Sequence, residues 1–433
     1  MHRAMYAGLF ACAVGVCLTT APATALAQES ALGALATQAK ASPQDASAAL
    51  AYGRALRKAG RIDDAIVALR RGASLHAARV TQLGSELHWE LSRAYVDRRD
   101  FGPAMVQCRV VQSRPGTQAA GHVCAAEAHL LWRRGSEVAV ELAQAQKASG
   151  FGKEAQFAAK VAEGRARELE LKEADAEAAY RAALHIIPDR PEALVRLGSL
   201  LHRMHKGGEA ELKKAVDLEP RDPDALFALA AVQRGKDRVQ LLERSIDERP
   251  MFAAAERALA LAQLDIGRVA DAKRTSDKIL ARDPSDLASL VVSGRVALAE
   301  KRYADALASA DKALAAQANS AAAKLLAADV RAAQGEIDLA LEAYQAAWGL
   351  DHTDPAPLVN ATLACIKARR LTSARAYAKK VTTEFPKDAS AWLVMGDTQL
   401  VDGDKAQARA SYERAKGLGA DPKVVEGKLS GAR

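Results

Sequence analysis

Aromatic residues are scarce in this sequence: Phe, Trp and Tyr together make up 4% of its 433 residues. Strands are enriched in aromatic and β-branched residues, whereas alanine, which is abundant here, is the best helix former. A single hydrophobic core rarely grows to this length. The composition therefore favours an all-α protein built from several domains or from a repeat array over a β-rich fold.

The sequence also lacks a block of like charge, although its formal net charge is +8. Basic and acidic residues alternate instead, as in the stretch from Arg57 to Asp64. Such alternation is typical of solvated helix faces, while nucleic-acid binding proteins concentrate their basic residues in a patch. We therefore expect no nucleic-acid partner.

Long apolar runs are absent except at the beginning of the chain. Arg3 precedes an apolar run from Met5 to Leu18, and Ala25-Leu26-Ala27 has the small-x-small pattern of a cleavage site before Gln28. This order is typical of a secretory signal peptide. The sequence predicts a signal peptide at residues 1–27, cleavage after Ala27, no membrane span in the mature chain and a location in the periplasm.

A lipoprotein anchored to the outer membrane is the alternative, because Cys12 and Cys17 lie in the signal region. Val16 fits poorly directly before a lipidated cysteine, and Cys12 leaves a very short apolar run before it. Cleavage after Ala27 is the preferred interpretation.

Sequence patterns of catalytic and metal sites are missing as well. The chain has neither a Gly-rich phosphate loop nor a Gly-x-Ser-x-Gly elbow. His202 and His205 could share one helix face, but a metal site usually needs three or four converging ligands. We expect no enzyme activity, no cofactor and no metal.

The strongest positive signal is an internal repeat. Small or apolar pairs recur at a step of 34 residues, at Leu259-Ala260, Ser293-Gly294, Ala327-Ala328, Ala361-Thr362 and Met395-Gly396. Each unit has apolar residues at spacings of three and four, a Gly or short basic turn, and a second helical stretch that begins near an acidic residue. Proline often ends the unit, because it cannot continue a helix.

These positions resemble the tetratricopeptide repeat family. In that family a small residue lies in the middle of the first helix, and another lies early in the second helix. A large residue follows four positions later, and then an alanine. The resemblance implies an all-α, right-handed superhelical solenoid of about eleven helix-turn-helix units. Matching units upstream contain Tyr52-Gly53, Leu91-Ser92, Gly164, Leu197-Gly198 and Leu229-Ala230.

The stretch from 120 to 157 matches the repeat poorly, so we place a domain boundary there. The expected organisation is residues 28–157 as N-terminal repeat units including a degenerate one, residues 158–422 as the main array, and residues 423–433 as a C-terminal tail.

The resemblance also bears on the cysteines left after cleavage. In this family the second helix of one unit packs on the first helix of the next, which would bring Cys108 and Cys124 together. An oxidising compartment would allow a disulfide between them; two buried reduced thiols are the alternative. Cys365 is unpaired and is interpreted as a buried hydrophobe.

In a solenoid of this kind the first helices line an inner face that typically binds an extended peptide or a partner helix. The candidate partner-binding residues lie one turn from the core stripe of each first helix, and an arginine beside an apolar row could hold a carboxylate. They are Trp89, Arg93, His202, Arg203, Arg257, Leu261, Leu264, Arg295 and Leu298.

The resulting hypothesis is a periplasmic scaffold that binds other envelope proteins or an extended peptide segment, as in gliding motility, pilus assembly, secretion or polysaccharide export. Some family members bind chaperone carboxylates with a Lys/Asn clamp, but this chain has only Asn319 and Asn360, and neither fits that arrangement. The alternative is a cell-wall or polysaccharide-binding protein, which would need more exposed aromatic residues. An enzyme is the least favoured reading.

Overall fold

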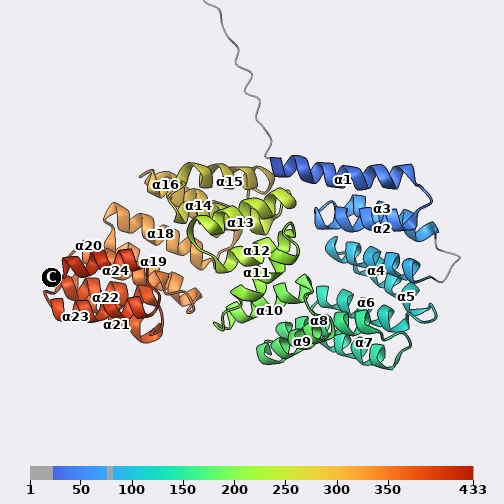
Figure 1. Cartoon of the computed structure of the whole chain (residues 1–433). Helices are drawn as coiled ribbons and strands as arrows, with labels where there is room; N and C mark the ends of the chain where they lie inside the picture. The colour runs from blue at the N-terminus through green and yellow to red at the C-terminus, as the bar shows by residue number, and fades with distance from the viewer. Residues whose placement is uncertain (1–22, 76–80, 433) are drawn as a thin grey trace, which may run out of the picture. The chain divides into compact units, whose positions relative to one another are not determined.

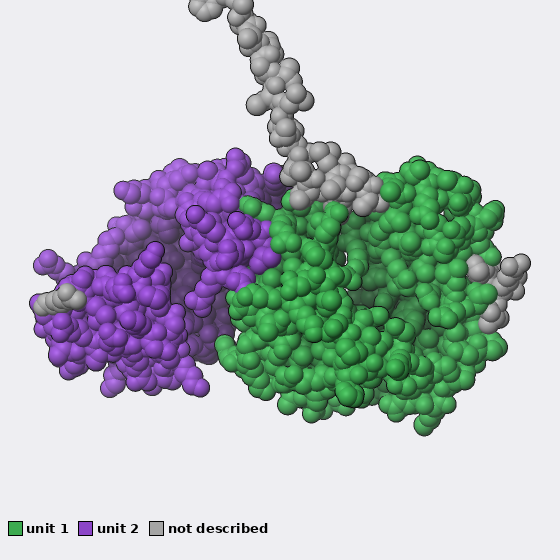
Figure 2. All heavy atoms as spheres, viewed as in Figure 1, with its two compact units in different colours: residues 1–232, 243–252 green, residues 233–242, 253–433 purple. Residues whose placement is uncertain are grey.

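The computed structural model describes residues 23–75 and 81–432, and this part of the chain consists of 24 helices without a strand. Contacts between the helices divide the chain into two units, coloured separately in Figure 2. Unit 1 comprises residues 1–232 and 243–252, and unit 2 comprises residues 233–242 and 253–433.

Figure 1 labels most of the helices along the chain. Unit 1 contains α1 (Ala23–Ala41), α2 (Ala46–Lys58), α3 (Ile62–Leu75), α4 (Gln82–Asp97), α5 (Phe101–Gln112), α6 (Gln118–Leu131), α7 (Gly135–Lys147), α8 (Lys153–Leu169), α9 (Glu173–Ile186), α10 (Pro191–Arg203), α11 (Glu209–Leu218) and α12 (Pro223–Val232). The helix α13 (Gly235–Glu248) contributes residues to both units. Unit 2 continues with α14 (Ala253–Asp265), α15 (Val269–Arg282), α16 (Leu287–Ala299), α17 (Tyr303–Ala316), α18 (Ala321–Gln334), α19 (Ile337–Leu350), α20 (Ala356–Lys367), α21 (Leu371–Glu384), α22 (Ala389–Val401), α23 (Lys405–Gly417) and α24 (Pro422–Gly431).

The helices from α2 to α23 form eleven successive pairs, in agreement with the expected number of units. In ten of the eleven pairs, all except α12 and α13, the two helices pack closely on each other, and the second helix also contacts the first helix of the following pair at most steps along the described chain. This nearest-neighbour packing is the arrangement of a repeat solenoid. The predicted all-α fold is confirmed.

Close packing inside each pair explains the small residues of the repeat. A Cβ atom added at Gly164 would lie 2.4 Å from the ring of Tyr180, and one added at Gly396 would lie 2.4 Å from the ring of Tyr412. Both tyrosines are fully buried. Only glycine leaves room for the ring there, which is why the crossing point of the two helices needs a small residue. The small residue early in the second helix is fully buried in eight pairs, at Ala65, Ala104, Ala176, Ala272, Ala306, Ala340, Ala374 and Ala408.

The turn between the two helices of a pair contains a residue with positive φ. Glycine serves in several turns, for example Gly60 (φ 77°) and Gly403 (φ 87°). Other turns use residues with a side chain, such as Arg99 (φ 66°), Arg133 (φ 55°) and Leu171 (φ 59°). The left-handed conformation stops the first helix and reverses the chain. Because arginine, lysine and leucine can take glycine's place there, the turn is hard to locate by searching for glycine alone.

The stretch that matched the repeat poorly folds as an ordinary pair, α6 and α7, which contact each other closely. The boundary that we placed at residue 157 falls inside α8. Likewise, the residues assigned to a C-terminal tail form α24, and its Val425 is fully buried. Sequence matching failed at these places because side-chain identity at the small-residue positions is relaxed, while the helical pattern persists.

Residues 1–22 of the expected signal peptide lie outside the described part of the chain, as do Cys12 and Cys17. Cleavage after Ala27 therefore stays a prediction. Among the described residues, no helix has the length and apolar character needed to cross a membrane.

The structure contains the predicted disulfide between Cys108 of α5 and Cys124 of α6, with the two Cα atoms 5.4 Å apart. Both sulfurs are buried in one apolar cluster with Ala125, against which Trp89 and Met105 pack. The bond joins the second helix of one pair to the first helix of the next. Cys365 is free and buried, as expected.

We expect iodoacetamide to alkylate Cys365 but not Cys108 or Cys124 in the unfolded, unreduced protein exported to its own compartment. After reduction all three should react, and stability should fall by about 3 kcal/mol, since the bond closes a loop of roughly 15 residues. Peptide mass spectrometry measures the labelling. Alkylated Cys108 or Cys124 before reduction would contradict the disulfide.

Unit 1 is closed by contacts between residues that are very distant in sequence. Lys58 at the end of α2 forms ion pairs with Glu219 (2.6 Å) and Asp222 (3.6 Å), which lie on either side of the turn between α11 and α12. Arg249, just after α13, donates to the backbone carbonyl of Lys58 (2.9 Å) and pairs with Asp224 (2.7 Å). The helix pairs of unit 1 thus form a closed ring.

An apolar contact with α1 lies beside this closure. A small cavity of about 170 Å³ is lined by Leu32 and Leu35 of α1, by Ala55 and Ala59 near the end of α2, and by Pro223 of α12, among others. The three helices therefore meet at one place in unit 1. The closure combines a mostly exposed ionic contact, which salt weakens, with an apolar contact that salt does not weaken.

Zero-length carbodiimide coupling tests this closure directly. Because the Lys58 ammonium and the Glu219 carboxylate are in contact, we expect an intramolecular Lys58–Glu219 amide bond at low salt, found by peptide mass spectrometry. The yield should drop in 0.5 M NaCl, where the Debye length is only about 4–5 Å. Lys147, exposed on α7, is the control and should give no such long-range product. A coupling yield for Lys58 no higher than for Lys147 would argue against a closed ring.

Candidate functional site

The inner face of each unit is formed by the first helices of the pairs. Successive first helices contact one another, for example α2 with α4, α4 with α6 and α6 with α8 in unit 1, and α14 with α16 in unit 2. Successive second helices of the described chain approach each other far less. The array therefore curves toward the first helices, and Figure 2 shows unit 1 hollowed near its centre.

Charged side chains follow the inner face of unit 1 in register. Arg54, Arg93, Glu127 and Arg165 each come directly after the small or buried residue at the crossing point of their own pair, which is Gly53, Ser92, Ala126 and Gly164. Equivalent positions on neighbouring first helices lie next to each other. The result is a row of charges across α2, α4, α6 and α8.

Glu90 of α4 lies at the centre of one cluster. Its side chain is 8% exposed and forms ion pairs with Arg57 (2.5 Å), Arg54 (3.2 Å) and Arg93 (3.6 Å). Burial opposes ionisation of this carboxyl group, but the three guanidinium groups outweigh burial and lower its pKa. Glu90 is therefore a fixed negative charge that holds three arginines on the inner face.

Glu127 of α6 extends the row toward α8. It pairs with Arg93 (2.6 Å) and accepts a hydrogen bond from Trp89 Nε1 (2.9 Å). Burial again opposes ionisation, and Arg93 and the Trp89 hydrogen bond overcome it, so the pKa of Glu127 is lowered. The Arg93 guanidinium also lies over the Trp89 ring, with its central carbon 5.3 Å from the ring centroid.

Arg165 of α8 is different from the arginines before it. It is half-buried, and no ion pair or hydrogen bond links its side chain to another described residue. Burial lowers its pKa, and the like charge of Arg196 on α10 lowers it further. Arg196 is exposed and is also without an ion pair within the described chain. The row of charges thus ends in two arginines without an ion pair in the described chain, although the charges of Glu127 and Glu192 act on Arg165.

The inner face of unit 2 has two equivalent carboxylates. Asp329 of α18 accepts hydrogen bonds from Tyr344 (2.7 Å) and Asn360 (2.9 Å). Asp397 of α22 accepts one from Tyr412 (2.8 Å) and pairs with Lys428 of α24 (2.6 Å).

Asn360 and Lys428 follow their carboxylates at the same sequence spacing. At this position Asp329 has the neutral amide of Asn360 as its partner, whereas Asp397 has the positively charged ammonium group of Lys428. Burial raises the pKa of Asp329, and the two hydrogen bonds and the charge of Arg295 only partly oppose it.

A family model for the tetratricopeptide repeat matches residues 257–321, 291–355 and 364–424, all within unit 2. These matches cover the helix pairs from α14 to α23 in which the repeat is most regular. The chain therefore contains tetratricopeptide repeats. Proteins with this repeat bind other proteins, and the fold is typical of interaction scaffolds.

Several solved structures are similar to this tetratricopeptide repeat protein. A tetratricopeptide repeat protein from Parabacteroides merdae is 16% identical with a TM-score of 0.42, covering 64% of this chain and 98% of that one. Yeast Tom70 is 13% identical with a TM-score of 0.46, covering 90% and 95%. The Cut9 and Hcn1 hetero-tetramer of the APC/C gives 14% identity and a TM-score of 0.47, covering 88% and 82%. No curated protein sequence matches the chain.

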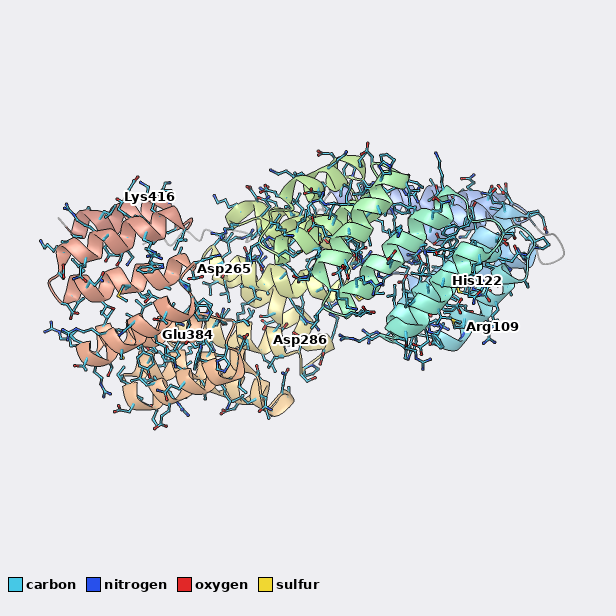
Figure 3. The ribbon with its side chains drawn as sticks, turned by 90° about the horizontal axis from the view of Figure 1, so that it is seen from below. Arg109, His122, Asp265, Asp286, Glu384 and Lys416 are labelled. Carbon is cyan, nitrogen blue, oxygen red and sulfur yellow. A yellow bond between two sulfur atoms is a disulfide. The ribbon has the colours of Figure 1, made fainter. Side chains whose placement is uncertain are left out.

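The structure places the predicted partner-binding residues in different surroundings. Trp89 and Arg93 meet at Glu127, as described above. Arg257 pairs with Asp286 (2.5 Å), the N-cap of α16, which Figure 3 labels. Arg203 pairs with Glu168, and His202 is exposed. The apolar candidates Leu261, Leu264 and Leu298 are half-buried against core clusters, and Arg295 is half-buried within electrostatic range of Asp329. Their role in binding stays a prediction.

Several inner-face residues were not predicted from the sequence, namely Glu90, Glu127, Arg165, Asp329 and Asp397. A signal for most of them exists, since Glu127 follows Arg93 by one repeat length, and Asp329 follows Arg295 likewise. Extending the candidates by the repeat period would have found Glu127, Asp329 and Asp397, but not Glu90 or Arg165. Among the described residues, no group of three or more side chains could hold a metal ion.

The matched pair Asp329 and Asp397 gives a pH-dependent prediction. Because burial raises the pKa of Asp329, its ionised form costs stability above that pKa, and the cost disappears as pH falls below the ordinary range of an aspartate. We expect Asp329→Asn to raise the unfolding temperature at pH 7.5 and to make no difference at pH 3. The Asn side chain can still accept from Tyr344 and Asn360.

Asp397→Asn is the control, because it leaves Lys428 without its counter-charge. It should lower stability at pH 7.5 by about 0.5–1 kcal/mol. Thermal unfolding followed by circular dichroism measures both variants. If Asp329→Asn and Asp397→Asn changed the unfolding temperature in the same direction at pH 7.5, the described difference between the two sites would be wrong.

Proposed function

We propose that this tetratricopeptide repeat protein is a periplasmic scaffold of the cell envelope that binds a segment of another envelope protein on its inner face. The observation that carries the proposal is the row of charged side chains on the first helices of unit 1. Ordered, partly exposed arginines and glutamates at equivalent repeat positions can bind complementary charges of a partner, and their regular spacing fixes where along the face the partner binds.

The location rests on the N-terminal sequence, with Arg3, the apolar run and Ala25-Leu26-Ala27. The disulfide between Cys108 and Cys124 supports the same location, because such bonds persist in oxidising compartments and are rare in the cytosol. Gliding motility, pilus assembly, secretion and polysaccharide export are envelope processes in which such a scaffold would serve.

Site-specific photo-crosslinking in living cells tests the proposal. A photoreactive amino acid would replace Ala231 or Leu363, which are exposed on first helices at the repeat position of Arg165 and Asp329. Matched controls are Val67 and Leu339, which are 68% and 46% exposed on second helices. We expect ultraviolet light to join the inner-face variants, but not the controls, to another envelope protein.

The same cells test the location. The protein should appear in the periplasmic extract, and its N-terminal residue should be Gln28. Adducts from Val67 or Leu339 alone would place binding on the outer face, and a chain that retains residues 1–27 in the cytoplasm would overturn the proposed location.

A further inference from the structure

The first described helix, α1, stands outside the repeat. The eleven helix pairs begin with α2, and α1, drawn in blue in Figure 1, contacts α2. From Leu32 onward α1 buries none of its side chains completely, whereas six residues of α2 are buried. Only one face of α1 is partly covered, at spacings of three and four residues. The half-buried residues of this face are Leu32, Leu35, Ala36 and Ala39.

Apolar contact alone attaches this face to the rest of unit 1. The side-chain hydrogen bond described for α1 runs from Thr37 to the backbone oxygen of Gly33, which lies in the same helix. Between residues 32 and 41, no described side chain forms an ion pair or a hydrogen bond with another helix. Helix α1 therefore lacks the directional polar contacts that join repeat helices, such as that of Arg57 with Glu90.

The covered face of α1 lies over the contacts that close the ring between α2 and the helices α12 and α13, which we call the seam. Leu32 and Leu35 line the cavity of about 170 Å³ together with Lys58, whose ion pairs belong to the seam. Arg221 and Glu248 also line it and pair with each other (2.8 Å). Because the two leucines leave this space unfilled, α1 is packed less tightly than a core helix.

These features make α1 easy to release. Residues 28–41, which remain of α1 after the predicted cleavage, have the length at which an isolated helix is only marginally stable in water. Without its contacts to the seam this segment loses its helix, so docking and helix formation occur together. Segments with few buried apolar contacts open locally at a low free energy.

Docking of α1 and closure of the ring stabilise each other. The two leucines reduce the water around Lys58, which lines the same cavity, and an ion pair is screened less where water is excluded. Conversely, the surface beneath α1 exists only while the end of α2 and the start of α12 are in contact, since both helices line it. Such coupling is reciprocal, so weakening either contact weakens the other.

We propose that α1 is a releasable strap on the ring of unit 1. Docked on the seam, it keeps the ring closed; once released, it leaves closure to the ionic contacts alone, which salt weakens. A closed ring admits only the free end of another chain to its hollow, whereas an open ring also admits the middle of a chain. The strap thereby controls which part of a partner reaches the inner face, a consequence that rests on the proposed function.

Hydrogen exchange followed by mass spectrometry tests the release of α1 in the mature protein. The amides of residues 28–41 should exchange at least about tenfold faster than those of α4, because local opening precedes unfolding of the repeat. Leu32→Ala with Leu35→Ala should remove the remaining protection of this segment. Alanine is the best helix former, so this loss reports lost contacts with the seam and not lost helix propensity. Circular dichroism melting checks that the repeat stays folded.

Thr37→Ala with Gln38→Ala is the matched control, because both residues are exposed on the opposite face of α1. It should leave the exchange of residues 28–41 within about twofold of that in the unsubstituted protein, as is usual for surface changes. Leu32→Met with Leu35→Met keeps the apolar volume and should retain the protection.

Carbodiimide coupling of Lys58 to Glu219 measures closure of the ring itself. At low salt the variant Leu32→Ala with Leu35→Ala should give the same yield as the unsubstituted protein. In about 0.15 M NaCl, where the Debye length is about 8 Å, its yield should fall at least about threefold below that of the control variant, because only the screened ionic contacts remain.

Three outcomes would overturn the inference. They are protection of residues 28–41 equal to that of α4, equal exchange of this segment in the leucine-to-alanine variant and the control, and equal coupling yields of these two variants at the higher salt. None of these measurements needs a partner, so failure of the strap and failure of the scaffold proposal are distinguishable.

Discussion

Everything in this fold depends on how closely two helices approach within a pair. The ring of Tyr180 lies over Gly164, and the ring of Tyr412 lies over Gly396, with no space for even one additional carbon. This contact fixes the angle of the pair, and repetition of the angle fixes the curvature of the array. Because every pair bends the array in the same direction, one side of the array is concave, and this side is the inner face. The position directly after the small residue is therefore presented to that face in each pair, whichever side chain occupies it.

The same tyrosines link the core to the binding surface. The hydroxyl of Tyr180 donates to Glu168, that of Tyr344 to Asp329 and that of Tyr412 to Asp397. Burial and the neighbouring carboxylate raise the pKa of each hydroxyl, so the tyrosines stay protonated donors. Each carboxylate in turn holds a group from the following first helix: Arg203, Asn360 or Lys428. Core packing thus determines where inner-face charges stand.

Periodicity predicted the helix pairs and their number, and the family resemblance to which it led implied the disulfide, because each of these depends on a pattern that recurs or on neighbours in the chain. Glu127 and Asp329 lay within reach of the same reasoning, since they repeat the positions of Arg93 and Arg295. The closure of unit 1 could not be predicted from periodicity. The contacts of Lys58 with Glu219 and of Arg249 with Asp224 occur once, and nothing in a single occurrence of Lys or Arg marks it as the end of a ring. That Arg165 has no ion pair in the described chain was equally hidden, because Glu127 pairs with Arg93 instead.

Closure of unit 1 changes how this part of the chain can lose structure. In an open repeat array the terminal repeats have neighbours on one side only, so they fray first and unfolding spreads inward. Here Lys58 at the end of α2 is held by Glu219 and Asp222 before α12 and by Arg249 after α13, so the first pair, α2 and α3, has neighbours on both sides. Opening the ring breaks one set of contacts without unfolding any helix. Unfolding one helix pair within the closed ring breaks two sets of contacts, one with each neighbouring pair. Unfolding of this unit should therefore be more cooperative than unfolding of a linear array of the same length.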